Sequence, residues 1–206
     1  FDEGLAGAAE AMRLAEEASF PPALGGGLLI TGFVHAITGR HDAADAELER
    51  GLTISRETHD FDRQGQARFL IGTLRNWHGR YADGLAQAVE GVRVTRDHRL
   101  VVPLIQCLWV EGVSRVGLGE YERALEALGE GLALAEKCGD EPYLARILNT
   151  LGWLRIVCHD FDPGLELSER GLVLARSSRD ATGPERAAFT LINEGDAFLA
   201  RGDLVL

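Results

Sequence analysis

Histidine and aspartate occur together twice in the tetrapeptide HDFD, at His59–Asp62 and at His159–Asp162. Imidazole and carboxylate groups at such spacing can hold a metal ion or act as an acid and a base. The two copies, however, fall at different places in the internal repeat described below, one between units and one in a turn. Turn chemistry alone explains aspartate and histidine at such places. We therefore predict no metal site and no catalytic residue in either copy.

Other motifs that carry chemistry are missing from the sequence. There is no P-loop, no nucleophile elbow, no HExxH and no dinucleotide-binding fingerprint. The triple glycine Gly25–Gly27 precedes no Lys-Ser/Thr pair and follows no predicted strand, so it is not expected to hold phosphate. We predict that this chain is not an enzyme and needs no cofactor.

The three cysteines, Cys107, Cys138 and Cys158, are odd in number and lack CxxC spacing. They suggest neither a disulfide framework nor a zinc site, but buried or half-buried thiols in a reducing cytoplasm. The net charge of −11 argues against nucleic-acid binding, which needs a basic stripe. No apolar run is long enough to span a bilayer, and no signal peptide is visible. We expect a cytoplasmic protein without membrane or nucleic-acid partners.

Glycines and turn residues recur every forty residues along the chain. A fixed period of this length is typical of solenoids, in which each unit buries its apolar face against its neighbours. The recurring sets are Gly32, Gly72, Gly112 and Gly152; Gly51, Gly91, Gly131 and Gly171; and Phe1, His41, Tyr81, Tyr121 and Phe161. After a slip of three residues, the pattern returns at Gly195 and Gly202.

Each forty-residue unit contains two stretches with helical periodicity, joined by a tight turn. The stretch 121–137 has the amphipathic spacing of one exposed helix, whereas 144–158 has a broader apolar face and is expected to be buried on more than one side. Gly39, Gly79 and Gly119 lie where the first helix must end in a left-handed residue. We predict an all-α fold: a right-handed α-solenoid of antiparallel helix pairs, with nine or ten helices.

Small residues inside the helices predict close helix crossings. Glycine in a helix costs about 1 kcal/mol relative to alanine, so its recurrence at fixed spacing needs a packing reason. Gly152 in a first helix and Gly164 and Gly171 in the second would let the two axes approach closely. Gly195 is expected to play the same part as Gly152.

The repeat resembles the tetratricopeptide (TPR) family. The residues that carry the resemblance are a small residue in the first helix, G-x-aromatic at the turn, and small residues three and ten positions later. In one unit these are Gly112, Gly119, Tyr121, Ala124 and Gly131. The period of 40 differs from the usual 34 and is similar to the arrays of kinesin light chains and of large LuxR-type bacterial regulators. Arg75, Arg115 and Arg155 stand where the family usually has an aromatic residue.

The organisation that follows is a single array over residues 1–206. It comprises a half-repeat (1–20), four repeats (about 22–60, 61–100, 101–140 and 141–180) and a second half-repeat (183–206). Solenoids need polar capping units at their ends, and neither end of the sequence resembles one. We expect this chain to be a segment of a longer protein.

The resemblance also implies a binding site, because in this family the first helices line a concave groove. The groove positions that we expect to contact a partner are Phe33, Gln66, Phe69, Asn76, Trp77, Gln106, Trp109, Arg146, Asn149 and Trp153. Amphipathic aromatics with a few amides are typical of peptide-binding and ligand-binding concavities. Alternatively, the superhelix is tight and these aromatics pack on one another as core.

Arg75, Arg115 and Arg155 form a ladder with forty-residue spacing. One interpretation is a stripe that binds an anion or an acidic partner. The interpretation that we favour is structural pairing with carboxylates on adjacent helices, such as Glu90, Glu130 or Asp160.

The functional hypothesis from the sequence is an interaction scaffold that binds a peptide segment or a partner domain, which could belong to the same parent chain. The alternative is the sensor arm of a bacterial ATP-dependent transcription regulator, with a small molecule or a protein as its ligand. A helix-turn-helix or a Walker motif in the parent chain would favour the second hypothesis.

Overall fold

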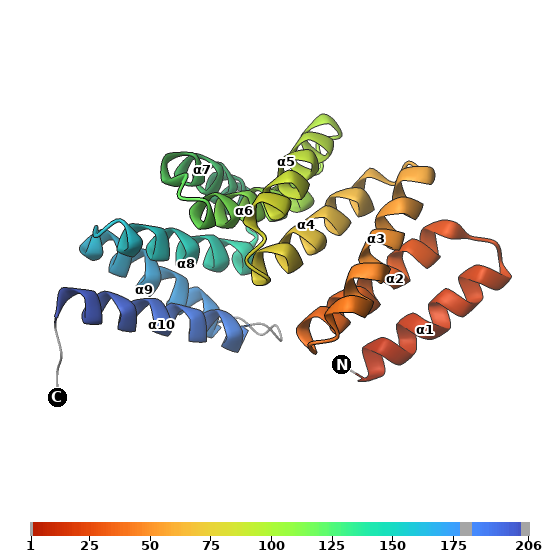
Figure 1. Ribbon diagram of the computed structural model, residues 1–206, viewed down its shortest axis with the longest axis horizontal. Coiled ribbons are helices and arrows are strands. Elements are labelled where there is room, and N and C mark those ends of the chain that lie inside the picture. The colour runs from red at the N-terminus through yellow and green to blue at the C-terminus, as the bar shows by residue number, and fades with distance from the viewer. Residues whose placement is uncertain (1, 178–182, 203–206) are drawn as a thin grey trace. The chain divides into compact units, whose positions relative to one another are not determined.

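The computed structural model describes residues 2–177 and 183–202, and over these residues it contains ten α-helices and no strand. From α1 to α9, the helices are joined by short turns (Figure 1). Their bounds are α1 Asp2–Glu17, α2 Pro21–Ile37, α3 His41–Glu57, α4 Phe61–Trp77, α5 Tyr81–Asp97, α6 Val101–Gly117, α7 Tyr121–Cys138, α8 Glu141–Val157, α9 Phe161–Ser177 and α10 Gly183–Arg201. The all-α prediction and the expected helix number are confirmed. From α2 to α9, each helix begins twenty residues after the one before it.

The turns explain this regular spacing. Between α1 and α9, each helix is followed by a residue with positive φ, and these residues also recur every twenty positions. Glycine supplies it at Gly39, Gly79, Gly119 and Gly139, with φ between 69° and 79°. After Gly39, Gly79 and Gly139, the next residue donates its N–H to a carbonyl five positions back, as Arg80 does to Arg75 at 2.9 Å. This bond stops the helix and reverses the chain.

Non-glycine residues adopt the same conformation in the other turns: Ser19, His59, Arg99 and His159, with φ between 51° and 61°. Asp60 N and Asp160 N then donate to Ser55 O and Arg155 O, each at 2.9 Å. Both HDFD segments therefore occupy the same kind of turn. The local role of their histidines is to end a helix.

The described residues divide into two compact units, residues 1–118 and 119–206. In the first unit, consecutive helices pack on one another, and the even-numbered helix α4 also contacts both α2 and α6. Among the described residues of this unit, no Cα atom of α1 lies within 8 Å of α3, and none of α3 lies within 8 Å of α5. The even-numbered helices are therefore inner helices, and the odd-numbered ones are outer helices that splay apart.

The second unit repeats this arrangement with α7 and α9 outside and α8 and α10 inside. The helix α8 packs on α7, α9 and α10, and α9 packs on α10. The broad apolar face predicted for residues 144–158 is confirmed, since α8 buries residues on several sides, including Ile147, Leu148 and Leu154.

One hydrophobic cluster of the first unit lies between α2, α3 and α4. Leu48 on α3 and Ile71 on α4 are fully buried there, together with Leu74. Burial of such side chains stabilises the fold by about 1.5–3 kcal/mol each relative to exposure.

Glycine lets inner and outer helices pack closely in both units. A Cβ atom on Gly32 would lie 2.8 Å from the Leu48 side chain, and one on Gly152 would lie 2.8 Å from the carbonyl oxygen of Gly164. The predicted close crossings are therefore present at both positions. The prediction was wrong for Gly195, where a Cβ atom would meet nothing within 4 Å.

The triple glycine has a packing role as well. A Cβ atom on Gly25 would lie 3.1 Å from Ile54 of α3, and one on Gly26 would lie 2.8 Å from the guanidinium carbon of Arg63. One on Gly27 would collide with Met12 of α1. These three glycines let three neighbouring helices approach α2.

Candidate functional site

The forty-residue period places equivalent residues at equivalent points of successive inner helices. Phe33 and Ile37 of α2 correspond to Thr73 and Trp77 of α4. The residues predicted to line a groove accordingly fall on α2, α4 and α6 in the first unit and on α8 in the second. We describe the two sets separately.

The aromatic residues of the first unit divide into an exposed pair and a packed pair. Trp77 is 48% exposed and Phe33 is 38% exposed. Trp109 is only 9% exposed, and its ring lies 6.3 Å from that of Phe69, tilted by 55°. The aromatic side chains thus have two kinds of environment. Phe69 and Trp109 pack on each other, whereas Trp77 and Phe33 present apolar surface to solvent.

Exposed apolar residues continue along α2. Ile30 and Ile37 are 53% and 37% exposed. With Phe33 they follow the i, i+3, i+7 spacing that places three side chains on one face of a helix. We call Ile30, Phe33, Ile37 and Trp77 the apolar stripe. It lies on two inner helices that contact each other, α2 and α4.

The amides of the first unit differ in their surroundings. Gln66 donates to Asp62 on its own helix at 2.6 Å. Asn76 is buried, accepts a hydrogen bond from the Ser114 hydroxyl at 3.0 Å, and donates to the carbonyl oxygen of Val110 at 3.5 Å. Asn76 thus links α4 to α6, although its neighbour in sequence is the exposed Trp77. The buried Oε1 of Gln106 has no hydrogen-bond partner among the described residues.

In the second unit, the three predicted residues lie along α8. The Asn193 amide of α10 donates to the backbone oxygen of Asn149 at 3.2 Å and to its side-chain oxygen at 2.5 Å. Arg146 lies 3.8 Å from Glu185 of α10, and its guanidinium carbon lies 6.0 Å from the centre of the Tyr143 ring. Trp153 is half-buried. Asn149 and Arg146 therefore contact α10, and their role in binding stays a prediction.

The arginine ladder makes ion pairs. Arg75 is buried and pairs with Asp45 and, at 3.3 Å, with Glu49, both on α3. Arg115 pairs with Glu111 at 2.7 Å, one turn earlier on the same helix. Arg155 pairs with Asp160 at 3.1 Å. Asp160 was among the expected partners, whereas the partners of Arg75 lie on the preceding helix.

Arg68 occupies a position where the equivalent residues on other inner helices are leucines, among them Leu108 and Leu148. Its side chain is buried, donates to Gln87 at 2.8 Å and lies 3.7 Å from Glu90. Burial lowers the pKa of the Arg68 guanidinium. Reasoning from the sequence missed this residue, although a charged residue in an otherwise leucine register was a visible signal.

The cysteines occupy two kinds of environment. Cys107 is fully buried, with its thiol 3.5 Å from the carbonyl oxygen of Gly65, and burial raises its pKa to about 12. Cys138 and Cys158 are exposed, and the sequence expectation of buried or half-buried thiols was wrong for both. In the part of the chain that the structure describes, no three His, Cys, Asp or Glu side chains gather as metal ligands would.

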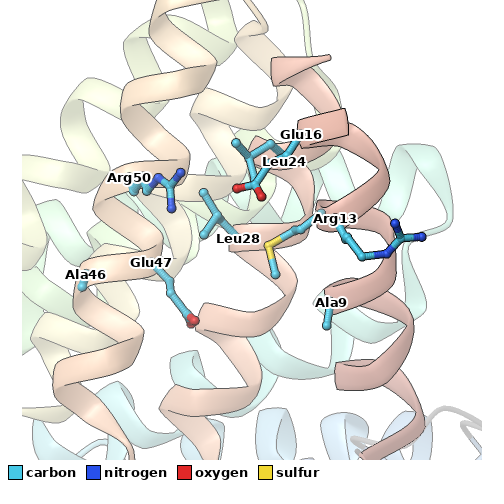
Figure 2. A pocket seen from close by; sticks show the side chains of 9 residues that line it. Ala9, Arg13, Glu16, Leu24, Leu28, Ala46, Glu47 and Arg50 are labelled. Atoms are coloured by element: carbon cyan, nitrogen blue, oxygen red, sulfur yellow. The ribbon is translucent and has the colours of Figure 1, made fainter. Parts of the chain in front are cut away.

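A cleft on the outer side of the first unit was not predicted from the sequence. It has a volume of about 460 Å³ and lies where α1 and α3 diverge over α2. Figure 2 shows Leu24 and Leu28 of α2 between Arg13 of α1 and Glu47 of α3. Its walls carry charges of both signs, from Arg13, Arg50, Glu16 and Glu47. Glu47 also lies 2.7 Å from the imidazole of His35.

Over the described residues, no helix is both long enough and apolar enough to span a membrane.

Comparison with known proteins identifies the fold. No family model matches the chain, and no curated protein matches it. Among solved structures, the chain is similar to BtubC (BKLC) from P. vanneervenii, with a TM-score of 0.75 and 20% sequence identity. The match covers 98% of this chain and 84% of BtubC. This likeness and the helix pairs described above show that the chain has an α-solenoid fold of TPR-like helical repeats.

Proposed function

We propose that the chain is an interaction module and that the apolar stripe of its first unit binds the apolar side chains of a partner peptide. The observation that carries this proposal is the exposure of Ile30, Phe33, Ile37 and Trp77 on adjoining inner helices. Large apolar side chains that lie together on a protein surface mark interaction sites.

The partner that fits this surface is a segment with two or more apolar anchors. Aromatic residues at the centre of an interface contribute most of its binding energy. Trp77 is the largest exposed aromatic of the unit and is the expected central contact. Of the other polar residues predicted for the first unit, the half-buried Gln66 and Gln106 would supply polar contacts, whereas Asn76 is buried.

A selection experiment tests this proposal even while the physiological partner is unidentified. Peptides are selected from a random display library on the purified chain, and their affinity is measured for Trp77→Ala, Phe33→Ala and Trp109→Ala. Trp77→Ala should weaken binding by about 2 kcal/mol with an unchanged melting temperature, as truncation of an exposed anchor does. Trp109→Ala should instead cost about 3–5 kcal/mol of folding stability, because it leaves a cavity.

Val173→Ala is the matched control, because Val173 is an exposed apolar residue, at 63%, on an outer helix of the other unit. It should leave peptide affinity unchanged. If the selected peptides bind Trp77→Ala as tightly as they bind the unsubstituted chain, the assignment of the stripe is refuted.

The sensor-arm hypothesis remains a second proposal at the level of the parent protein. It rests on the resemblance of the forty-residue period to that of large bacterial regulators. Reading the parent open reading frame for a Walker motif and a helix-turn-helix separates the two hypotheses.

A further inference from the structure

The cleft between α1 and α3 combines an apolar floor with charged walls. Its volume of about 460 Å³ is typical of small-molecule sites, and Leu24 and Leu28 of α2 lie at its floor. Figure 2 shows the side chain of Arg50 on α3 reaching towards Leu28, while Glu16 comes from α1 on the other side. Over the described residues, neither Arg50 nor Glu16 forms an ion pair.

The other two charged residues of the cleft already have partners. Arg13 pairs with two carboxylates on its own helix, at the surface of α1. Glu47 lies 2.7 Å from the imidazole of His35 on α2. What remains available to a ligand is a cation on α3 and a carboxylate on α1, on either side of the apolar floor.

The next repeat shows what fills the same space inside the chain. With an offset of 40 residues, α3, α4 and α5 form an equivalent frame of two outer helices over one inner helix, and Arg68 replaces Leu28. The Arg68 side chain donates to Gln87 of α5 at 2.8 Å and lies 3.7 Å from Glu90. Both of these residues correspond to residues of α3 that line the cleft. An arginine side chain therefore occupies the second frame, whereas the shorter Leu28 leaves the first frame open.

The two frames carry opposite charges at two positions. Glu16 stands where the second frame has Arg56, and Arg50 stands where it has Glu90. In the second frame, burial lowers the pKa of Arg68, and the positive charge of Arg56 lowers it further. In the first frame, Glu16 would instead attract a guanidinium, and Arg50 would attract an anion. A ligand that satisfies the first frame needs both a cation and an anion.

We propose that the cleft between α1 and α3 binds an arginine with a free carboxylate, either the amino acid itself or the C-terminal residue of a peptide. The guanidinium would pair with Glu16, and the carboxylate would pair with Arg50. Both are guanidinium–carboxylate pairs, which can form two parallel hydrogen bonds. The methylene stem would lie on Leu24 and Leu28, since such stems pack along apolar surface.

Titration of the isotope-labelled, 206-residue chain with L-arginine, followed by amide NMR, tests the proposal. It is done at low salt, because salt screens interactions between exposed charges. The shifts should saturate with a dissociation constant below about 1 mM and should be confined to α1, α2 and α3. Agmatine, which lacks the carboxylate, and norleucine, which lacks the guanidinium, should each bind about tenfold more weakly.

A fourth ligand, N-acetyl-L-arginine, distinguishes the two sources of the arginine. Its blocked amine mimics the C-terminal residue of a peptide. Binding as tight as that of L-arginine indicates a peptide C-terminus, whereas binding of L-arginine alone indicates the free amino acid.

Substitutions locate the site. Leu28→Arg supplies an arginine from the floor, as Arg68 does in the second frame, and should abolish binding while circular dichroism shows a folded chain. Arg50→Gln should weaken L-arginine binding about tenfold and leave agmatine binding unchanged, because agmatine has no carboxylate for Arg50. Arg170→Gln is the matched control, since Arg170 is the equivalent exposed residue on α9. It should bind L-arginine as the unsubstituted chain does.

Three results would overturn the proposal. The first is the absence of saturable shifts with L-arginine up to about 10 mM. The second is unchanged binding to folded Leu28→Arg, which would place the ligand elsewhere. The third is agmatine binding as tight as that of L-arginine, which would show that Arg50 holds no carboxylate. Because Arg50 is exposed, its substitution keeps the test decisive even if Leu28→Arg does not fold.

Discussion

At the residue scale, replacement of glycine should have opposite effects on stability at two equivalent positions, Gly152 and Gly195. Gly152→Leu should destabilise the fold by about 3 kcal/mol or more, since the new side chain would overlap the Gly164 backbone and Ser168 of α9. Gly195→Leu should leave the melting temperature unchanged or raised, because its side chain would enter open space and leucine is a better helix former than glycine. Urea unfolding of both variants measures the difference. Equal stability of the two would refute the close crossing of α8 and α9.

The thiols give a second prediction at this scale. Ellman's reagent at pH 8 should titrate Cys138 and Cys158 in the native chain, and Cys107 only after unfolding, because Cys107 is buried. The folded pKa of Cys107 is raised from 9.0 to about 12. The unfolded thiol therefore ionises first, and its contribution to stability is complete below pH 9 and is lost as the pH rises from 9 towards 12. Cys107→Ala should remove this component of the alkaline loss, and an unchanged profile would contradict the assignment.

At the element scale, an ion pair that joins two helices should contribute more to stability than an exposed pair within one helix. Arg75 is buried on α4 and pairs with two carboxylates on α3, Asp45 and Glu49. Asp45→Asn with Glu49→Gln would leave a buried guanidinium uncompensated and should cost about 1–3 kcal/mol, below the range for fully buried pairs because the carboxylates are partly exposed. Chemical unfolding gives the value.

The matched control also involves one arginine between two carboxylates. Arg13 pairs with Glu10 at 2.6 Å and with Glu17, all on the surface of α1. Glu10→Gln with Glu17→Gln should leave the unfolding curve unchanged, since solvent and salt screen exposed pairs. A similar loss of stability from both double variants would show that burial of Arg75 does not matter.

At the scale of the whole molecule, contacts are confined to neighbouring helices, and stability should be local as well. Hydrogen exchange of Gly152→Leu should increase in α8, α9 and α10, while α2, α3 and α4 keep their protection. In repeat arrays, stability is a sum of unit terms and nearest-neighbour terms. A uniform rise in exchange along the chain would indicate one cooperative core and contradict this expectation. The unsubstituted chain, measured in parallel, provides the reference.

The sequence alone determined the helical architecture, because it depends on local signals. Gly39, Gly79 and Gly119 end helices through their own backbone conformation, and the apolar periodicity selects the buried side of each helix. The forty-residue period then assigned residues such as Trp77 and Trp109 to inner helices. These features depend only on the residues of a helix and its immediate neighbours.

Only the tertiary structure decided which parts of those faces are open. Trp77 and Trp109 both lie on inner helices, yet one is 48% exposed and the other is 9% exposed, because the packing of adjacent helix pairs covers one and not the other. Asn76 is buried because Ser114 of α6 reaches it. Gly195 shares the register of Gly152, but a Cβ atom there would meet nothing within 4 Å. Exposure depends on neighbours that a periodic pattern does not encode.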